Sequence, residues 1–161
     1  MFDAELAFLQ FRKILELIAF SSLIANRTLY SATHANFSNH WKAKDMLAAI
    51  EKLNPEYYPF PIQPPEVQPN GTKLITPVVD GFLTVEDFVA LYDVSSAFLH
   101  TKNPFTTKGP VLSTVYAGKE WICRIRKLVT LHMIHPVDGR KWIIEVPANN
   151  PVHVFTAERR E

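Results

Sequence analysis

His100 and Asp93 have the residue types and the spacing that suit general acid–base chemistry. They lie seven residues apart near the end of a predicted helix, which places them on one face, two turns apart. An imidazole in such a place can act as a general base while the carboxylate orients it. The alternative is a histidine at a helix C-terminus, stabilised by the helix dipole or by a terminal carbonyl.

A second group of residues suits a nucleic acid. Arg124 and Lys127 lie close to Trp121 in a predicted amphipathic helix, and Arg140-Lys141-Trp142 follows. Cationic side chains grip a phosphate backbone, and aromatic rings stack on bases. An ordinary amphipathic helix has the same composition, so both interpretations stay open.

A metal site is the third possibility, with Cys123, His132, His135 and His153 as its ligands. Imidazole and thiolate bind zinc and other transition metals. His132 and His135, however, lie three residues apart in a predicted strand, so their side chains point to opposite faces. We therefore expect neither a metal nor another cofactor, and the sequence has no phosphate loop, dinucleotide fingerprint or nucleophile elbow.

The first predicted helix carries a polar stripe of Arg12, Lys13 and Glu16. Glu16 can pair with either cation, which is typical of a solvated stripe, whereas a functional role would place it in a cleft. The second half of this helix, residues 17–25, is apolar almost all round. It is predicted to be the central helix of a bundle or half of an oligomer interface, and we expect a homodimer.

The helices and strands that position these residues are predicted from the hydrophobic period and from capping and turn residues. Helical spacing predicts further helices over about 41–53, 84–102 and 115–129, with Thr84 and Asp87 approximating a capping box. Residues 55–81 hold seven of the twelve prolines and are predicted to form a long loop with at most one short strand near 74–79. Period-two patterns predict strands at 131–135, 141–146 and 152–156.

The predicted fold class is therefore α+β, a bundle of about four helices with a small C-terminal antiparallel meander. We expect one domain over residues 1–161, with a helical part at 1–130 and a β element at 131–157. A chain of this length forms one hydrophobic core.

Composition and charge narrow the classes of function. The net charge of +1 excludes a highly charged tail protein, although residues 108–161 hold nine Lys and Arg against five Asp and Glu. A single cysteine cannot form an internal disulfide, which favours the cytoplasm over an oxidising compartment. Sequons at Asn26, Asn36 and Asn70 matter only in a secreted chain. The longest apolar stretch is too short to span a bilayer, so no membrane association is expected.

Four segments resemble an uncharacterised bacterial domain family associated with HEPN-like helical proteins of defence and mobile-element loci. They are Phe8-Leu-Gln-Phe-Arg-Lys-Ile-Leu-Glu-Leu-Ile-Ala19, Asn39-His-Trp-Lys-Ala-Lys44, Leu53-Asn-Pro-Glu-Tyr-Tyr-Pro59 and Leu91-Tyr-Asp-Val-Ser-Ser-Ala-Phe-Leu-His-Thr-Lys-Asn-Pro-Phe105. The resemblance implies a dimeric helical bundle. HEPN ribonucleases cut RNA with an arginine and a histidine separated by four to six residues.

Two pairs in this sequence match that spacing, Arg126 with His132 and Arg27 with His34. The resemblance implies that the histidine would act as general base on a ribose 2′-hydroxyl while the arginine stabilises the developing phosphorane, without a metal. Arg126 falls late in its predicted helix, where the family has its arginine early. The leading prediction is therefore a non-catalytic bacterial interaction or regulatory domain in a phage-defence setting. The alternative is a metal-independent HEPN-type ribonuclease, so the expected partner is a protein or RNA.

Overall fold

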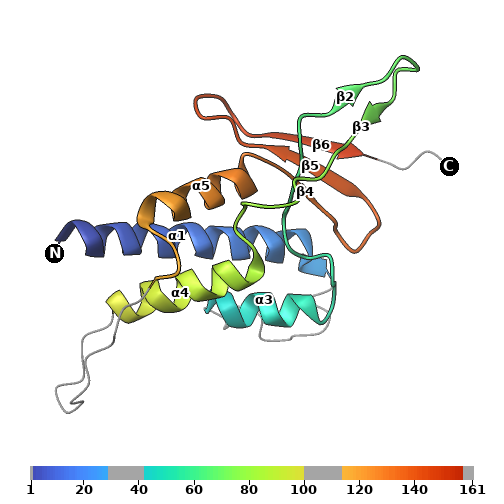
Figure 1. Ribbon diagram of the computed structural model, residues 1–161. Coiled ribbons are helices and arrows are strands. Elements are labelled where there is room, and N and C mark those ends of the chain that lie inside the picture. Colours follow the sequence, from blue (N-terminus) through green and yellow to red (C-terminus); the bar gives the residue numbers. More distant parts are fainter. Residues whose placement is uncertain (1, 29–41, 100–113, 158–161) are drawn as a thin grey trace, which may run out of the picture.

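A computed structural model describes residues 2–28, 42–99 and 114–157 of the chain. Its described helices are α1 (Phe2–Ala25), α3 (Ala43–Glu51), α4 (Val85–Leu99) and α5 (Gly118–Val129). They hold nearly half of the described residues, and the larger sheet forms mainly from strands near the C-terminal end (Figure 1). The predicted α+β class is confirmed.

Helix α1 is the centre of the helical layer. It lies between α5 on one side and α3 and α4 on the other (Figure 1). Its inner face is buried at Phe11, Leu15, Ile18 and Ala19, which recur at helical spacing. The other helices complete this core with Leu47, Ile50, Phe88, Leu91, Trp121, Ile125 and Leu128. Of the two alternatives predicted for this helix, the structure shows the central place among the described helices, although Leu17 and Ile24 remain exposed.

Helix α4 begins where the sequence predicts a cap. The backbone N–H of Asp87 donates to Oγ1 of Thr84 at 3.2 Å. Asp87 does not complete a reciprocal capping box, because its carboxylate accepts from Arg124. The pKa of Glu86 is lowered by its own backbone hydrogen bond and by the Thr84 side chain.

The C-terminal strands form the predicted meander. β4 (Leu131–Ile134), β5 (Lys141–Glu145) and β6 (His153–Ala157) pair in antiparallel order, and Met133 lies opposite Ile143. Gly139 has φ of 79° in the turn between β4 and β5, a conformation that glycine adopts without strain. Residues 153–156 of β6 are exposed, because β6 is an edge of the sheet.

The proline-rich segment differs from the predicted loop. β1 (Phe60–Pro61) adds a fourth strand to the sheet beside β4, in the order β1-β4-β5-β6. Pro61 is tolerated there because β1 is the other edge strand. β2 (Glu66–Val67) and β3 (Lys73–Leu74) form a separate ribbon that projects from the molecule (Figure 1). An isolated antiparallel β-bridge pairs Ile62 with Pro77 at the base of this ribbon.

Two buried asparagines join the helical layer to the sheet. Nδ2 of Asn54 donates to Oδ1 of Asn26 and to the carbonyl of His135, each at 2.8 Å. Asn26 in turn donates to the carbonyl of Ser22. Asn26 is only 1% exposed, so the first of the three sequons is a structural asparagine. Within residues 2–28, 42–99 and 114–157, no helix combines the length and the hydropathy needed to cross a bilayer.

Candidate functional site

Arg126 and His132, the pair implied by the resemblance, lie in different environments. His132 is in β4 with 6% exposure, and its Nδ1 is 3.0 Å from the carbonyl oxygen of Val129. Burial lowers the pKa of His132, which keeps its ring neutral at pH 7. Arg126 is exposed on α5. No hydrogen bond joins the two among the described residues, and His34 of the second pair lies outside them.

The other proposed acid–base pair is only half described, since His100 lies outside the described residues. Asp93 is on α4, where its carboxylate accepts from Nζ of Lys44 at 2.9 and 3.2 Å. Both side chains are about half exposed. Asp93 therefore belongs to a charged surface formed by α3 and α4.

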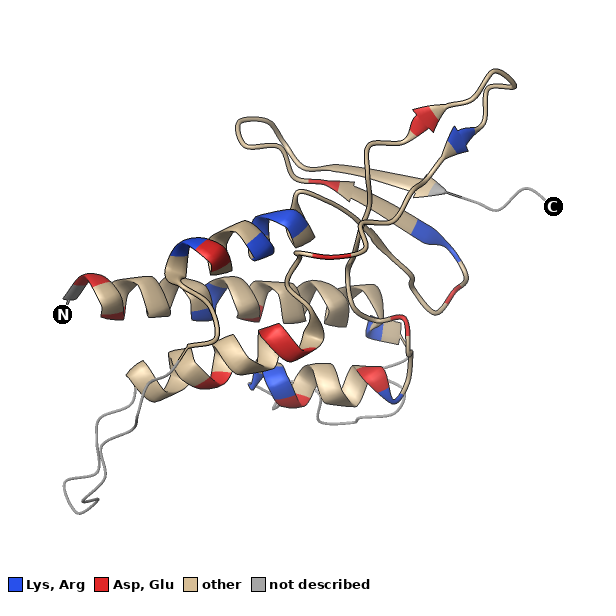
Figure 2. Ribbon diagram, viewed as in Figure 1, with Lys and Arg blue, Asp and Glu red and all other residues tan. Residues whose placement is uncertain are grey.

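The residues proposed to bind nucleic acid take different places. Trp121 is 2% exposed, and its ring packs edge-on against Tyr116 in the core, so it offers no open face to a base. Nζ of Lys127 lies 3.6 Å from Oδ1 of Asp80. Figure 2 shows that Lys and Arg positions gather along α5, and Glu120 lies among them.

Arg124 connects α5 to the start of α4. Its Nη1 donates to Asp87 at 3.0 Å and to the carbonyl of Phe82 at 3.3 Å, and its Nε donates to Glu120 at 3.0 Å. The guanidinium also stacks on the Tyr116 ring, 3.9 Å from the centroid. Two carboxylates thus surround one largely buried cation, so Arg124 holds two helices together.

The four candidate metal ligands are dispersed. Cys123 is on the exposed side of α5, and His132 is buried in the sheet. Nδ1 of His135 lies 3.2 Å from Glu56, and Nδ1 of His153 lies 3.3 Å from Glu145. Within the described part of the chain, no three His, Cys, Asp or Glu residues are placed to share a metal ion.

A cavity of about 290 Å³ lies between α1, α3 and α4. Seven residues line it, namely Arg12, Lys42, Lys44, Asp45, Tyr92, Asp93 and Ser96. Three of them are cationic and two are acidic. Among the described lining residues only Tyr92 has an aromatic ring, so polar contacts dominate recognition by this part of the wall.

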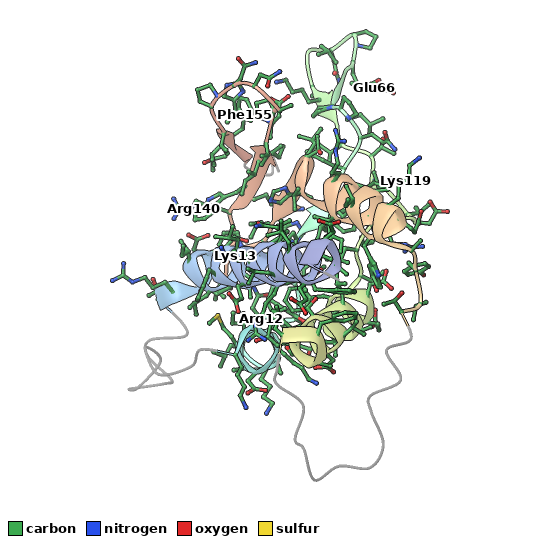
Figure 3. All side chains as sticks on the ribbon, turned by 90° about the vertical axis from the view of Figure 1, so that its left-hand side faces the viewer. Arg12, Lys13, Glu66, Lys119, Arg140 and Phe155 are labelled. Carbon is green, nitrogen blue, oxygen red and sulfur yellow. The ribbon has the colours of Figure 1, made fainter. Side chains whose placement is uncertain are left out.

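Arg12 reaches the cavity from α1 and is held in place by three side chains. Nε donates to Glu16 at 3.0 Å, Nη1 to Oγ of Ser96 at 2.8 Å, and Nη2 to the hydroxyl of Tyr92 at 3.1 Å. Oγ of Ser96 donates to the carbonyl of Tyr92 at 2.8 Å. Figure 3 shows Arg12 on the side of α1 that faces α3 and α4, with Lys13 on its other side.

The first turn of α3 forms the opposite wall. Lys42 is the N-cap residue, and its own side chain makes no capping bond to the first backbone N–H groups of α3. Lys44 and Asp45 follow in the same turn, and Lys42 is exposed. The partial positive charge of a helix N-terminus thus adds to the lysines.

Sequence reasoning identified part of this site. It singled out Arg12, Glu16 and Asp93 but missed Tyr92 and Ser96. One signal was available, because Tyr92 and Ser96 lie four residues apart and so share a face of α4. That this face meets Arg12 depends on the packing of α1 on α4.

A separate surface lies on the outer face of α1. Leu6, Leu17 and Ile24 are 57%, 67% and 67% exposed. With Gln10, Lys13 and Phe20 they recur at alternating steps of four and three residues, the spacing of a coiled-coil seam. We call these six residues the α1 seam.

The chain matches no family model, no curated protein and no solved structure. Functional inference for this protein therefore rests on its own residues and their geometry.

Proposed function

We propose that this chain is a non-catalytic interaction domain that works as a homodimer, with the α1 seam as the dimer contact. The observation that carries the proposal is the exposure of Leu6, Leu17 and Ile24 at seam spacing on a helix whose other face is fully packed. Over 18 residues the seam is about 27 Å long. A second copy supplies an identical seam, as a two-fold dimer requires.

Charge favours an antiparallel arrangement of the two seams. In a parallel pair, Lys13 would face Lys13 of the second copy, which is unfavourable in an apolar seam. In an antiparallel pair centred on residue 15, Leu6 meets Ile24 and Lys13 meets Leu17. Asp3 then lies beside Arg27 of the second copy, and both are exposed in the single chain. Opposite charges therefore meet at both ends of the seam.

The placement of Arg126 and His132 supports this proposal over the ribonuclease. A cyclising cleavage needs the base and the cation at one phosphate. His132 is buried and bonded to Val129, whereas Arg126 is exposed. The proposed domain therefore acts by binding, and its dimerisation can be measured directly.

The test is the molar mass of the purified full chain in solution, measured by light scattering across a concentration series. We expect about twice the 18.4 kDa of one chain. Leu17→Lys places a charge opposite Lys13 and is expected to weaken the dimer about tenfold or more. Val79→Lys is the matched control, because Val79 is 87% exposed and lies outside α1. Circular dichroism verifies that both variants fold.

The orientation is tested by a charge exchange. Asp3→Arg is expected to weaken the dimer, and Asp3→Arg combined with Arg27→Asp is expected to restore it. A monomeric wild-type chain, or a dimer unaffected by Leu17→Lys, would overturn the proposed contact. A dimer that Leu17→Lys disrupts but the exchange does not restore would overturn the antiparallel arrangement.

A further inference from the structure

We propose that the cavity between α1, α3 and α4 binds the phosphate group of a small phosphomonoester. This site goes beyond the proposed dimer contact, because Arg12 lies on the side of α1 that faces α3 and α4, whereas Lys13 of the α1 seam lies on its other side (Figure 3). Its volume of about 290 Å³ exceeds that of a phosphate ion alone and lies at the small end of ligand pockets, which begin at roughly 300 Å³. A phosphate carrying a small polar group therefore fits best.

Arg12 is the main recognition element of the proposed site. A guanidinium has five N–H donors in a fixed plane. Three of them are engaged by Glu16, Ser96 and Tyr92. This leaves one hydrogen on each terminal nitrogen, and two such donors match two oxygens of a phosphate. The three existing bonds hold the plane in position before the ligand arrives, which reduces the entropy lost on binding.

Two neutral hydroxyls shape the same wall. The Tyr92 hydroxyl accepts from Arg12, so its own hydrogen is available to a ligand oxygen. The Ser96 hydroxyl already donates to the Tyr92 carbonyl. This bond fixes the orientation of the Ser96 oxygen, which accepts from Nη1 of Arg12. Because neither group carries charge, Arg12 retains more positive potential than a guanidinium between two carboxylates.

The lysines supply the remaining charge. Lys44 pairs with Asp93, but both side chains are about half exposed, and an exposed pair of this kind is weak. Lys44 can therefore turn toward a dianion while water solvates Asp93. Lys42 and the N-terminal amides of α3 lie on the same wall. A phosphate dianion carries two negative charges and is stabilised by several cations at once. A carboxylate carries one charge and gains less from the same cations.

Binding is tested by calorimetric titration of the full chain with inorganic phosphate at constant ionic strength, and then with glycerol 3-phosphate beside glycerol. We expect both phosphates to bind and glycerol not to bind. Lys42→Gln and Lys44→Gln change exposed residues and are each expected to weaken binding about threefold. Lys119→Gln removes a charge from an exposed position of α5, outside the cavity and the α1 seam, and is the control. Arg12→Lys keeps the charge but loses the planar donors, so we expect a loss of about tenfold.

Removal of the acidic neighbours gives a result that a purely structural role would not produce. Asp93→Asn frees Lys44 and is expected to tighten phosphate binding about twofold. Glu16→Gln keeps an oxygen for Nε of Arg12 while removing a charge, and it is expected to act in the same direction. Absence of phosphate binding by the folded wild-type chain would overturn the proposal. Equal weakening by Lys119→Gln and Lys44→Gln would overturn it as well, because it would indicate unspecific attraction.

Discussion

Arg12 on α1 and Arg124 on α5 have closely similar surroundings. Each donates from Nε to a glutamate four residues away at 3.0 Å. Each also lies over a tyrosine ring, at 4.9 Å from the Tyr92 centroid for Arg12 and 3.9 Å from the Tyr116 centroid for Arg124. Both reach across to α4, and yet the structure uses the two arginines differently.

The difference lies in what satisfies the terminal nitrogens. Arg124 donates to the Asp87 carboxylate and to a backbone carbonyl, so two acids surround it. Arg12 meets two neutral hydroxyls and a single acid, and it lines a cavity. An arginine neutralised twice stabilises a helix contact, whereas an arginine beside hydroxyls and lysines can still attract an anion. Residue type alone does not separate the two roles.

The largest expected effect is the loss of the Arg124 contact. Arg124→Met keeps the stem but leaves the Asp87 carboxylate, 15% exposed, without its cation. We expect the free energy of unfolding to fall by about 3 kcal/mol, as for a buried pair that loses one partner. Urea denaturation measures this. Arg126→Met on the exposed side of the same helix is the control, and an equal loss there would contradict the difference in roles.

Arg12→Met is expected to have a smaller effect on stability, about 1 kcal/mol. Its acid partner Glu16 is 31% exposed and can be solvated, and the two hydroxyls can find water. The same denaturation experiment applies, again with Arg126→Met as control. If Arg12→Met lowered the free energy of unfolding as much as Arg124→Met, Arg12 would also hold two helices together. The proposed difference between the two arginines would then be wrong.

The smallest expected effect is a pH dependence of the free energy of unfolding. It comes from His132 in the sheet and not from the two arginines. The pKa of His132 is lowered by burial, and the same ring titrates near 6.5 when the chain is unfolded. Between these two pKa values the unfolded state binds more protons, so stability is complete above pH 6.5 and is lost as the pH falls toward the folded pKa.

This pH dependence is measured by urea denaturation at pH 7.5 and 5.5 in wild type and in His132→Asn. Asparagine keeps a donor for the Val129 carbonyl and does not titrate. We expect the wild type to lose more stability than the variant over this range. Equal losses would show that other groups, and not His132, set the acid sensitivity.

Much of the fold could be predicted because its signals are local. The 3.6-residue period of α1 placed Leu15 and Ile18 in the core, and Thr84 marked the start of α4. Alternation predicted β4, β5 and β6, and Gly139 has the positive φ expected in the turn between β4 and β5. β1 was missed because two residues in a proline-rich segment have no periodicity. Its place beside β4 depends on a partner about 70 residues further along the chain.

The candidate site could be predicted only in part. The Arg12–Glu16 pair lies within one helical turn, so the sequence indicates it. The contacts of Arg12 with Ser96 and Tyr92 cross 84 and 80 residues of chain. Trp121 illustrates the reverse case, since a ring that resembles a stacking platform in the sequence is 2% exposed.

The sequence by itself determined the helices and the strands β4, β5 and β6, because local periodicity, caps and turns depend on near neighbours. Only the tertiary structure decided which charges meet. The packing of α1 on α4 placed Arg12 beside two hydroxyls, and the packing of α5 on the start of α4 placed Arg124 beside Asp87. The environment of a charge depends on residues that are distant in the sequence. An arginine therefore joins two helices at position 124 and lines a candidate ligand site at position 12.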